Sequence, residues 1–490
     1  MPRRLACLLA LACCEPPVPQ DSPAPAAARP VPQDIPAPPV PSDSVAAARD
    51  ACLAAHADAP ARYVGLVRAF CSEHAHLGGV GASLAVAEAG ALRYTATTGL
   101  RCVHGDPVTP DTPFRVGSLT KLLTAALALD RANHDLLDAP LPELADHPDP
   151  RARAITTRQL LHHTSGLPDL DPRAAADTPW RAALAARPLW AAPDALWSYS
   201  NAGYALVGAA LERGAGEPYP ALLARRILDP LRLTRTTADR DRALQMHAAC
   251  GHLGRGPDAV PLDVRQDLEL GAAGAAWTIP AGGLIASASD LLDLVLALHD
   301  PARSPLSADA RRALFAAGPL THERPRERQA PGLRAEPLPD GGLLHRLSGR
   351  TGDFTADLSF APDHGFALVV LTNTGDPLRA TLAAAHADLL GLRPTAGPPA
   401  PAAAYAGQYE LPDRTTILVD DDLTLTAPSL GLDRTPLAHT GDHRFHAAAP
   451  AHAVTFVFTA GPDHATHLRA RGFVAGRVKT RRGSPARPSG

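Results

Sequence analysis

The chain reads Phe114-Arg115-Val116-Gly117-Ser118-Leu119-Thr120-Lys121 directly before an apolar run. The apolar residues recur at helical spacing, at Leu119, Leu122, Leu123, Ala126 and Leu127. This pattern predicts a helix that begins at Ser118. Residues three positions apart share one face of a helix, so the Ser118 hydroxyl and the Lys121 amine can touch.

The scarcity of lysine makes this pair informative. Lys and Arg together number 47, yet Lys121 and Lys479 are the only lysines. With 18 serines in the chain, about 0.07 Ser-x-x-Lys matches are expected by chance in this composition. Arg stays protonated, whereas a Lys can be tuned to lose its proton. The pair therefore favours chemistry, and the alternative is a helix cap beside a solvated lysine.

A lysine can act as a base only when its amine is neutral. The free amine has a pKa of about 10.4, and an efficient base needs roughly 7 to 8. The site must therefore disfavour the ammonium form by about 4 kcal/mol. Burial and cationic neighbours are the expected causes.

A second motif is Trp197-Ser198-Tyr199-Ser200-Asn201, followed by an apolar helix over residues 204–211. A Tyr hydroxyl can relay a proton, and an Asn side chain can donate to a substrate carbonyl while it accepts from Lys. As a lone tripeptide, Tyr-x-Asn is most often part of a capping loop. It becomes specific beside an upstream Ser-x-x-Lys.

With both motifs present, the chain resembles the serine β-lactamase and penicillin-binding protein superfamily. The nearest branch is the class C β-lactamase-like one, which holds esterases, D-aminopeptidases and D-Ala carboxypeptidases. The resemblance covers roughly residues 60–392. Further matching stretches are Pro110 to Arg115, Ile155 to Asp169, Ile227 to Leu231 and Pro280 to Asp290.

The resemblance implies a role for each motif residue. Ser118 would form an acyl-enzyme, Lys121 and Tyr199 would share the base role, and Asn201 would bind the substrate carbonyl. No metal or other cofactor is expected. The pair His162-His163 is interpreted as structural, because no further His or Asp stands at metal spacing near it.

The third motif of the family departs from its usual form. Leu347-Ser348-Gly349 stands where Lys-Thr-Gly or His-x-Gly is usual, and Asp353 replaces a Gly. Ser348, Gly349 and Arg350 are still predicted to contact substrate. The N–H groups of Arg350 and Ser118 would form the oxyanion hole.

The missing cation bears on the substrate. In the family that group helps to bind a free carboxylate, so its loss favours esterase or amidase activity over true β-lactamase activity. His345 could replace it through a bulge, and Arg346 or Arg350 could supply the charge, which keeps a cell-wall peptidase open. The alternatives are a catalytically weak binding protein of the cell envelope and, more remotely, a metallohydrolase.

Strand patterns occur at both ends of the segment and helices between them. Strands are expected over residues 81–87, 91–98, 355–360 and 366–372, and helices over 44–76 and 377–390. This order predicts an α/β plus α architecture, with a β-lactamase/transpeptidase-like antiparallel sheet, flanking helices and an inserted helical region. The main domain is predicted to span residues 44–393.

A small all-β domain is predicted to follow. Short alternating runs appear over residues 416–419, 423–426 and 453–458, after a linker at 394–404. The opening Tyr405 to Tyr409 resembles the lipocalin-like domain often appended to this branch. The predicted barrel spans residues 405–478, and a disordered tail spans 479–490.

The N-terminus resembles a secretory signal over residues 1–14, with a basic start and a short apolar run. Ala10-Leu11-Ala12-Cys13 resembles a lipobox, which would attach lipid at Cys13. Eleven of the 28 residues from 15 to 42 are proline, so residues 15–43 are expected to form an extended tether. The predicted location is secreted or periplasmic, with a lipid anchor as an option.

Composition adds two limits. The net charge of −3 gives no basic field for nucleic acid, so a small ester, amide or cell-wall peptide is the expected partner. In an oxidising compartment disulfides persist. Four cysteines beyond the signal, at 52, 71, 102 and 250, allow three pairings, and the spacing does not choose among them.

Overall fold

A computed structural model describes residues 42–131, 137–170, 179–262, 276–321, 326–392, 401–410, 416–427, 432–441, 444–447, 452–457, 465, 467–470 and 473–477. The predicted signal peptide, its Cys13, the tether up to residue 41 and the tail at 479–490 lie outside these residues. Residues 394–400 of the predicted linker lie outside them as well.

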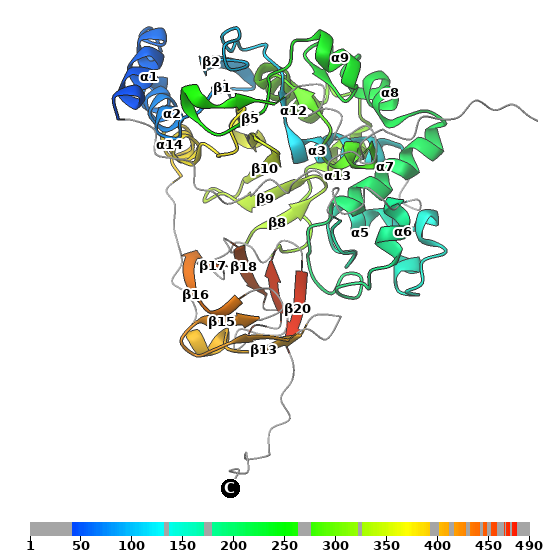
Figure 1. Cartoon of the computed structure of the whole chain (residues 1–490). Coiled ribbons are helices and arrows are strands. Elements are labelled where there is room, and N and C mark those ends of the chain that lie inside the picture. Colours follow the sequence, from blue (N-terminus) through cyan, green and yellow to red (C-terminus); the bar gives the residue numbers. More distant parts are fainter. Residues whose placement is uncertain are drawn as a thin grey trace, which may run out of the picture. The chain divides into compact units, whose positions relative to one another are not determined.

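The larger part of the chain is built on a seven-stranded antiparallel sheet (Figure 1). In spatial order its strands are β2 Ala91–Gly99, β1 Gly81–Glu88, β12 Phe366–Thr372, β11 Phe354–Ala361, β10 Leu343–Thr351, β9 Leu333–Pro337 and β8 Arg328–Ala330. β1 pairs with β12. Strands from the two ends of the segment therefore close one sheet, as predicted.

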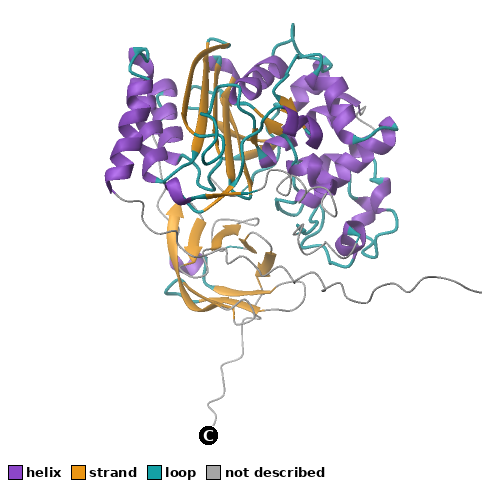
Figure 2. Ribbon diagram, turned by 45° about the horizontal axis from the view of Figure 1, so that its top comes forward, coloured by secondary structure: helices purple, strands orange, loops and turns teal. Residues whose placement is uncertain are grey.

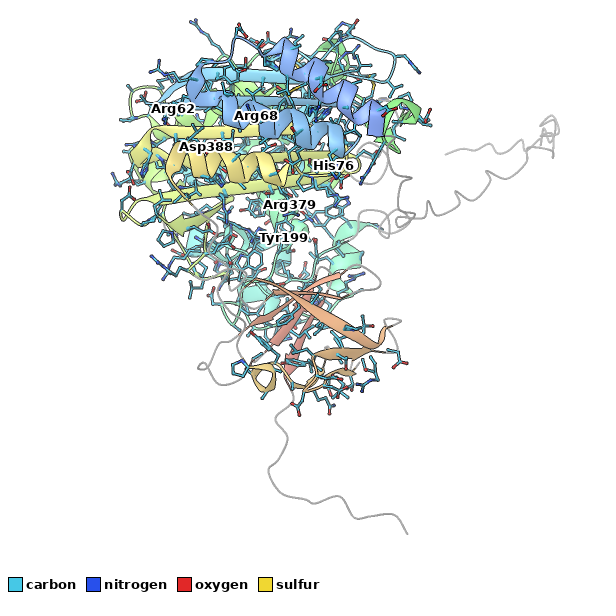
Figure 3. The ribbon with its side chains drawn as sticks, turned by 90° about the vertical axis from the view of Figure 1, so that its left-hand side faces the viewer. Arg62, Arg68, His76, Tyr199, Arg379 and Asp388 are labelled. Atoms are coloured by element: carbon cyan, nitrogen blue, oxygen red, sulfur yellow. A yellow bond between two sulfur atoms is a disulfide. The ribbon has the colours of Figure 1, made fainter. Side chains whose placement is uncertain are left out.

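Helices cover both faces of this sheet (Figure 2). On one face lie α1 Ser42–Ala55, α2 Val64–His76 and α14 Arg379–Leu390, and α2 runs beside α14 (Figure 3). There Phe70 packs with Val86 and Leu368 in one apolar cluster. Alternate residues of the strands point to the other face, where α3 Thr120–Arg131 and α12 Ala288–His299 share a second, larger cluster.

Helices, most of them short, fill the region between β2 and β8, which is the predicted helical insertion. They are α5 Thr157–Leu161, α6 Trp180–Ala185, α7 Asn201–Ala215, α8 Tyr219–Leu223, α9 Arg240–Gln245, α11 Ile279–Gly282 and α13 Ala308–Leu314. Two small sheets join them, one of β3 Phe114–Arg115, β7 Ile285–Ala286 and β4 Thr236–Thr237, the other of β5 His252–Leu253 and β6 Val260–Pro261. α3 packs against α7, α11 and α13, so three segments of the insertion meet at this helix.

Two helix predictions were wrong in detail. The predicted helix over residues 44–76 is two helices, because Pro60 lacks a backbone N–H and disfavours helical geometry in the residue before it. The helix predicted to begin at Ser118 begins at Thr120. Ser118 lies instead in a 3₁₀ turn over Gly117–Leu119.

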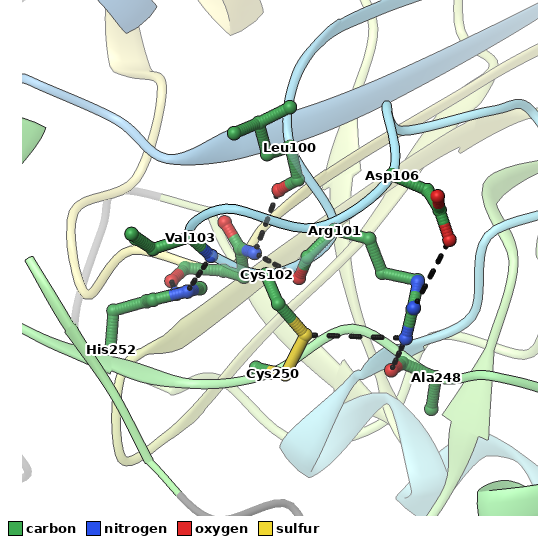
Figure 4. The surroundings of a disulfide bond; sticks show 9 residues. Leu100, Arg101, Cys102, Val103, Asp106, Ala248, Cys250 and His252 are labelled. Atoms are coloured by element: carbon green, nitrogen blue, oxygen red, sulfur yellow. Dashed lines mark hydrogen bonds and ion pairs between the residues drawn. A yellow bond between two sulfur atoms is a disulfide. The ribbon is translucent and has the colours of Figure 1, made fainter. Parts of the chain in front are cut away.

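Two disulfides resolve the three possible pairings. Cys52–Cys71 joins α1 to α2, and Cys102–Cys250 joins the loop after β2 to the segment before β5. Around the second bond (Figure 4), the Arg101 guanidinium donates to the carbonyl of Ala248 at 3.3 Å. This disulfide therefore ties a loop of the sheet to the inserted region.

The C-terminal strands form a closed barrel in simple chain order. They are β13 Gly407–Glu410, β14 Thr416–Val419, β15 Thr424–Ala427, β16 Leu432–Gly441, β17 Arg444–Ala447, β18 His452–Val457, β19 His467–Ala470 and β20 Phe473–Arg477. Tyr405, Tyr409 and Phe445 fill the interior, and the Tyr409 hydroxyl donates to the Tyr405 carbonyl at 2.6 Å. A separate small all-β region therefore follows the sheet, as predicted.

Among the described helices, none is long and apolar enough to cross a membrane.

The two disulfides should differ in their effect on stability. Replacing Cys102 and Cys250 by Ala opens a loop of 148 residues, and chain entropy predicts a loss of about 5 kcal/mol in the free energy of unfolding. Replacing Cys52 and Cys71 opens a loop of 19 residues, for a predicted loss of about 3 kcal/mol. Denaturant unfolding of both double variants measures this order. A larger loss for the Cys52 and Cys71 pair would contradict it.

Candidate active site

Ser118 is presented at the entrance to α3. The short strand β3 pairs with β7, and Gly117 then turns the chain with a φ of 51°, which favours glycine. A Cβ on Gly117 would lie 3.0 Å from the amide nitrogen of Arg350. Gly117 thus lets the turn approach β10 closely, and the half-buried Ser118 stands beside that strand.

Lys121 is fully enclosed in the first turn of α3, with 1% of its surface exposed. Its Nζ lies 3.2 Å from the Ser118 Oγ, 2.7 Å from the Asn201 Oδ1 and 2.6 Å from the Ala281 carbonyl oxygen. A neutral amine has two N–H groups and one lone pair. The two short contacts can take the N–H groups, which leaves the lone pair for the Ser118 hydroxyl.

Burial sets the protonation of this amine. Desolvation lowers the pKa of Lys121 to about 7, and the negative charge of Asp169 opposes the shift. Burial therefore brings the pKa of Lys121 into the range of 7 to 8 expected for an efficient base. The cationic neighbours that the sequence analysis expected are not among the causes that lower this pKa.

Tyr199 and Asn201 reach the same point from the start of α7. The Tyr199 hydroxyl lies 2.6 Å from the Ser118 Oγ and donates to the Asn201 Oδ1 at 3.2 Å. Ser200 caps α7 by accepting from the Gly203 N–H, which fixes its two neighbours at the helix entrance. The structure therefore brings together the four side chains of the first two motifs.

The third motif contributes backbone. β9 pairs with β10 only over Leu343 to Arg346, so the next residues of β10 run past the 3₁₀ turn. A Cβ on Gly349 would lie 2.0 Å from the Val116 carbonyl oxygen and 3.0 Å from the Ser118 amide nitrogen. Only glycine allows this approach, which keeps the backbone N–H groups of Arg350 and Ser118 in one neighbourhood.

The Ser348 side chain does not join the site, contrary to the prediction. Ser348 lies opposite Asp357 on β11, and its hydroxyl donates to the Asp357 Oδ1 at 2.5 Å. The charged groups near Asp357 include Glu73 and Arg379 of the helices on the other face of the sheet. Successive side chains of a strand alternate between faces. Ser348 therefore points away from Ser118.

The substitutes considered for the missing cation are also engaged elsewhere. His345 is buried and its Nε2 donates to the Phe315 carbonyl at 2.9 Å, and burial lowers its pKa to about 4. Arg346 forms ion pairs with Glu336 and with Glu327. Arg350 is exposed, and because it stands two residues after Ser348 on β10 its side chain is on the same face of the strand, away from Ser118, so only its backbone N–H is near the turn.

The sequence did not assign contacts in the site to three residues, of which His163 had been interpreted as structural and Asp169 and Ala281 had no role. The Asp169 carboxylate accepts from the Asn201 backbone N–H at 2.7 Å and from its Nδ2 at 2.9 Å. The Ala281 carbonyl binds Lys121, and the buried His163 packs its ring 4.6 Å from that of Tyr199. All three lie in stretches that carried the family resemblance, but no pattern within those stretches assigned them a contact. Among the described residues, no cluster of His, Cys, Asp and Glu could hold a metal.

A serine hydroxyl, a buried amine of lowered pKa and a phenol in contact define the constellation of a serine acyl-transfer enzyme. Residues 66–393 match the beta-lactamase family, and the chain belongs to this family of serine hydrolases. The resemblance inferred from the motifs is thereby confirmed.

Similar proteins include penicillin-binding protein 4 of Amycolatopsis lactamdurans, 31% identical over 250 residues, which are 48% of this chain and 63% of that protein. The D-alanyl-D-alanine-carboxypeptidase/endopeptidase AmpH of Escherichia coli (strain K12) is 34% identical over 151 residues, 27% of this chain and 39% of that protein. The chain thus spans less than two thirds of the length of the curated relatives it matches.

Solved structures give the same fold. SurE is 27% identical with a TM-score of 0.62 over 88% of this chain and 100% of that one, and it has also been solved with D-Leu. A class C beta-lactamase has a TM-score of 0.57 over 68% of this chain and 97% of that one. At 21% identity this last likeness concerns the fold alone.

Gly349→Ala should abolish chemistry by displacing β10. The added methyl collides with the Val116 backbone carbonyl, so β10 must move away from Ser118 and its amide nitrogen. We expect loss of Ser118 labelling by a fluorophosphonate probe in protein that still folds, with a lower melting temperature because the collision is with backbone. Gly341→Ala, at a turn where a Cβ meets nothing within 4 Å although φ is 95°, controls for a general effect of replacing glycine. Wild-type labelling of Gly349→Ala would contradict the close approach.

Proposed function

We propose that the chain is an extracytoplasmic serine hydrolase that forms an acyl-enzyme on Ser118 and cleaves esters or amides. The carrying observation is the position of the Lys121 amine between the Ser118 Oγ and two short hydrogen-bond acceptors. That arrangement supports a neutral amine whose lone pair meets the serine proton.

In the first half-reaction the Ser118 Oγ attacks the acyl carbonyl, and its proton passes to Lys121, directly or through the Tyr199 hydroxyl. The N–H groups of Ser118 and Arg350 are proposed to stabilise the oxyanion. The proton then goes to the departing alcohol or amine as its bond to the acyl carbon breaks. In the second half-reaction water attacks the acyl carbonyl and gives a proton to Lys121, and the Ser118 Oγ takes that proton as its bond to the acyl carbon breaks and the acid is released.

The third motif argues for the substrate class. Leu347 is buried and apolar at the position where a cation would bind a free carboxylate. A substrate ester or amide that has no carboxylate loses no binding energy when that cation is absent. The relatives support an amide next to a D-residue, since AmpH is named a D-alanyl-D-alanine-carboxypeptidase/endopeptidase and SurE has been solved with D-Leu. We therefore propose esters and D-amino-acid amides before β-lactams.

The proposed location rests on the signal-like N-terminus and on the two disulfides, which persist in oxidising compartments. The lipid anchor at Cys13 and the division into tether, hydrolase domain and barrel stay predictions of the sequence. The alternative of a catalytically weak binding protein draws on Leu347 and Asp353, the two departures in the third motif.

Exposure to p-nitrophenyl esters, D-amino-acid amides and nitrocefin, followed by intact-mass analysis, tests the proposal. We expect an acyl adduct on wild type, located on Ser118 and absent from Ser118→Ala, with ester and amide turnover exceeding that of nitrocefin. A folded wild type that neither turns over nor labels would favour the binding protein instead. Efficient nitrocefin turnover would contradict the substrate order.

Activity should depend on the protonation of Lys121. The cation must lose its proton to act as base, and its pKa is about 7, so kcat/KM for a neutral ester should rise with pH and level off above about pH 7. Lys121→Arg, which stays protonated, should lose about 10²- to 10⁴-fold. The pH profile of p-nitrophenyl acetate hydrolysis measures both. An acidic limb near pH 10, where a free lysine titrates, would count against the buried base.

A further inference from the structure

Asp169 lies next to the catalytic residues and accepts two hydrogen bonds from Asn201. Its Oδ1 accepts from the Asn201 backbone N–H at 2.7 Å, and its Oδ2 accepts from the Asn201 Nδ2 at 2.9 Å. The Asn201 Oδ1 in turn accepts from Lys121 and Tyr199. One carboxamide thus joins a carboxylate on its nitrogen side to the reacting groups on its oxygen side.

The oxygen of a side-chain carboxamide accepts hydrogen bonds, whereas its NH₂ group donates them. Rotating the amide by a half-turn exchanges these two groups. An ionised carboxylate only accepts hydrogen bonds, so it requires the nitrogen end of Asn201. The reversed amide would place two acceptors together at Asp169 and its N–H groups against the donors of Lys121 and Tyr199. Asp169 therefore selects the orientation seen in the structure.

We propose that Asp169 is a positioning residue that locks the Asn201 amide with its oxygen toward Lys121. The lock keeps an acceptor for one N–H of the Lys121 amine and leaves the second Nδ2 hydrogen of Asn201 for the acyl carbonyl. This role rests on the proposed function, and it adds a residue that touches none of the reacting atoms.

Asp169 also acts on Lys121 by its charge. The groups that face the Lys121 amine are Ser118, Asn201, the Ala281 carbonyl, the rings of Tyr199 and Tyr204, and the neighbouring charge of Asp169. The carboxylate favours the ammonium form and so opposes burial. Nearby His163 is buried and its pKa is lowered, in part by Lys121, so it adds no positive charge at neutral pH.

Asp169→Asn is the sharpest variant. A carboxamide at 169 has one oxygen and one NH₂ group, so in either orientation it leaves one of the two Asn201 donors facing another donor. With p-nitrophenyl acetate we expect kcat at the alkaline plateau to fall about tenfold, as for loss of a charge-assisted bond. The acidic limb should move to lower pH, because the charge that raises the pKa of Lys121 is gone. Asp169→Ala should change both in the same directions.

Asp194→Asn is the matched control. Asp194 also accepts two hydrogen bonds, in its case both from side chains, Gln159 at 2.6 Å and Thr164 at 2.8 Å, instead of from Asn201. It has a φ of 61°, which Asn tolerates. We expect wild-type kcat and an unmoved acidic limb.

A double-mutant cycle with Asn201→Ala separates positioning from general support. If Asp169 acts through Asn201, Asp169→Asn should cost no further plateau kcat in that background. An equal tenfold loss there would overturn the role, as would an acidic limb that moves up toward the value of a free lysine, which signals water entering the site. Wild-type behaviour of Asp169→Asn overturns this inference alone, whereas an inactive wild type overturns the proposed function.

Discussion

The enclosure of Lys121 is the constraint on which the site depends. Removing an amine from water disfavours its ammonium form, and the pKa falls to about 7 as a result. The unfolded chain therefore binds one proton more than the native state between about pH 7 and the ordinary value of 10.5. Over that window this group makes the free energy of unfolding rise with pH. The base is thus prepared by burial, at a cost to stability that is greatest below pH 7.

This enclosure requires three distant segments to meet. Asn201 begins α7, Ala281 lies in α11 and Ser118 enters α3, so the acceptors around the amine are 80 and 160 residues away in sequence. β10 closes the remaining side, where Gly349 admits the Val116 carbonyl. The sheet supports this arrangement because β1 and β12, which come from opposite ends of the segment that forms it, pair directly.

The sequence predicted what depends on local spacing and on motif chemistry. The strands around β1 and β12, the grouping of Ser118 with Lys121 and the small barrel all follow from periodicity or motif. The position of the helix start did not, because Gly117 takes a left-handed conformation and tightens the first turn. The sequence also did not predict on which face of the sheet the Ser348 side chain lies. A strand pattern shows that successive side chains alternate between the two faces, but not which face is toward Ser118. Asp169 has no motif of its own, and only the fold brings its carboxylate to Asn201.

Leu347 links the substrate question to the base. A cation in the third motif would bind a carboxylate and would also help to lower the pKa of a nearby lysine. Leu347 is buried in the same apolar cluster as Leu119 and Leu122, which flank Lys121 in sequence. An apolar side chain at this position supplies no such electrostatic help, and burial alone lowers the pKa of Lys121. The route to a neutral lysine therefore does not depend on a cation in the third motif.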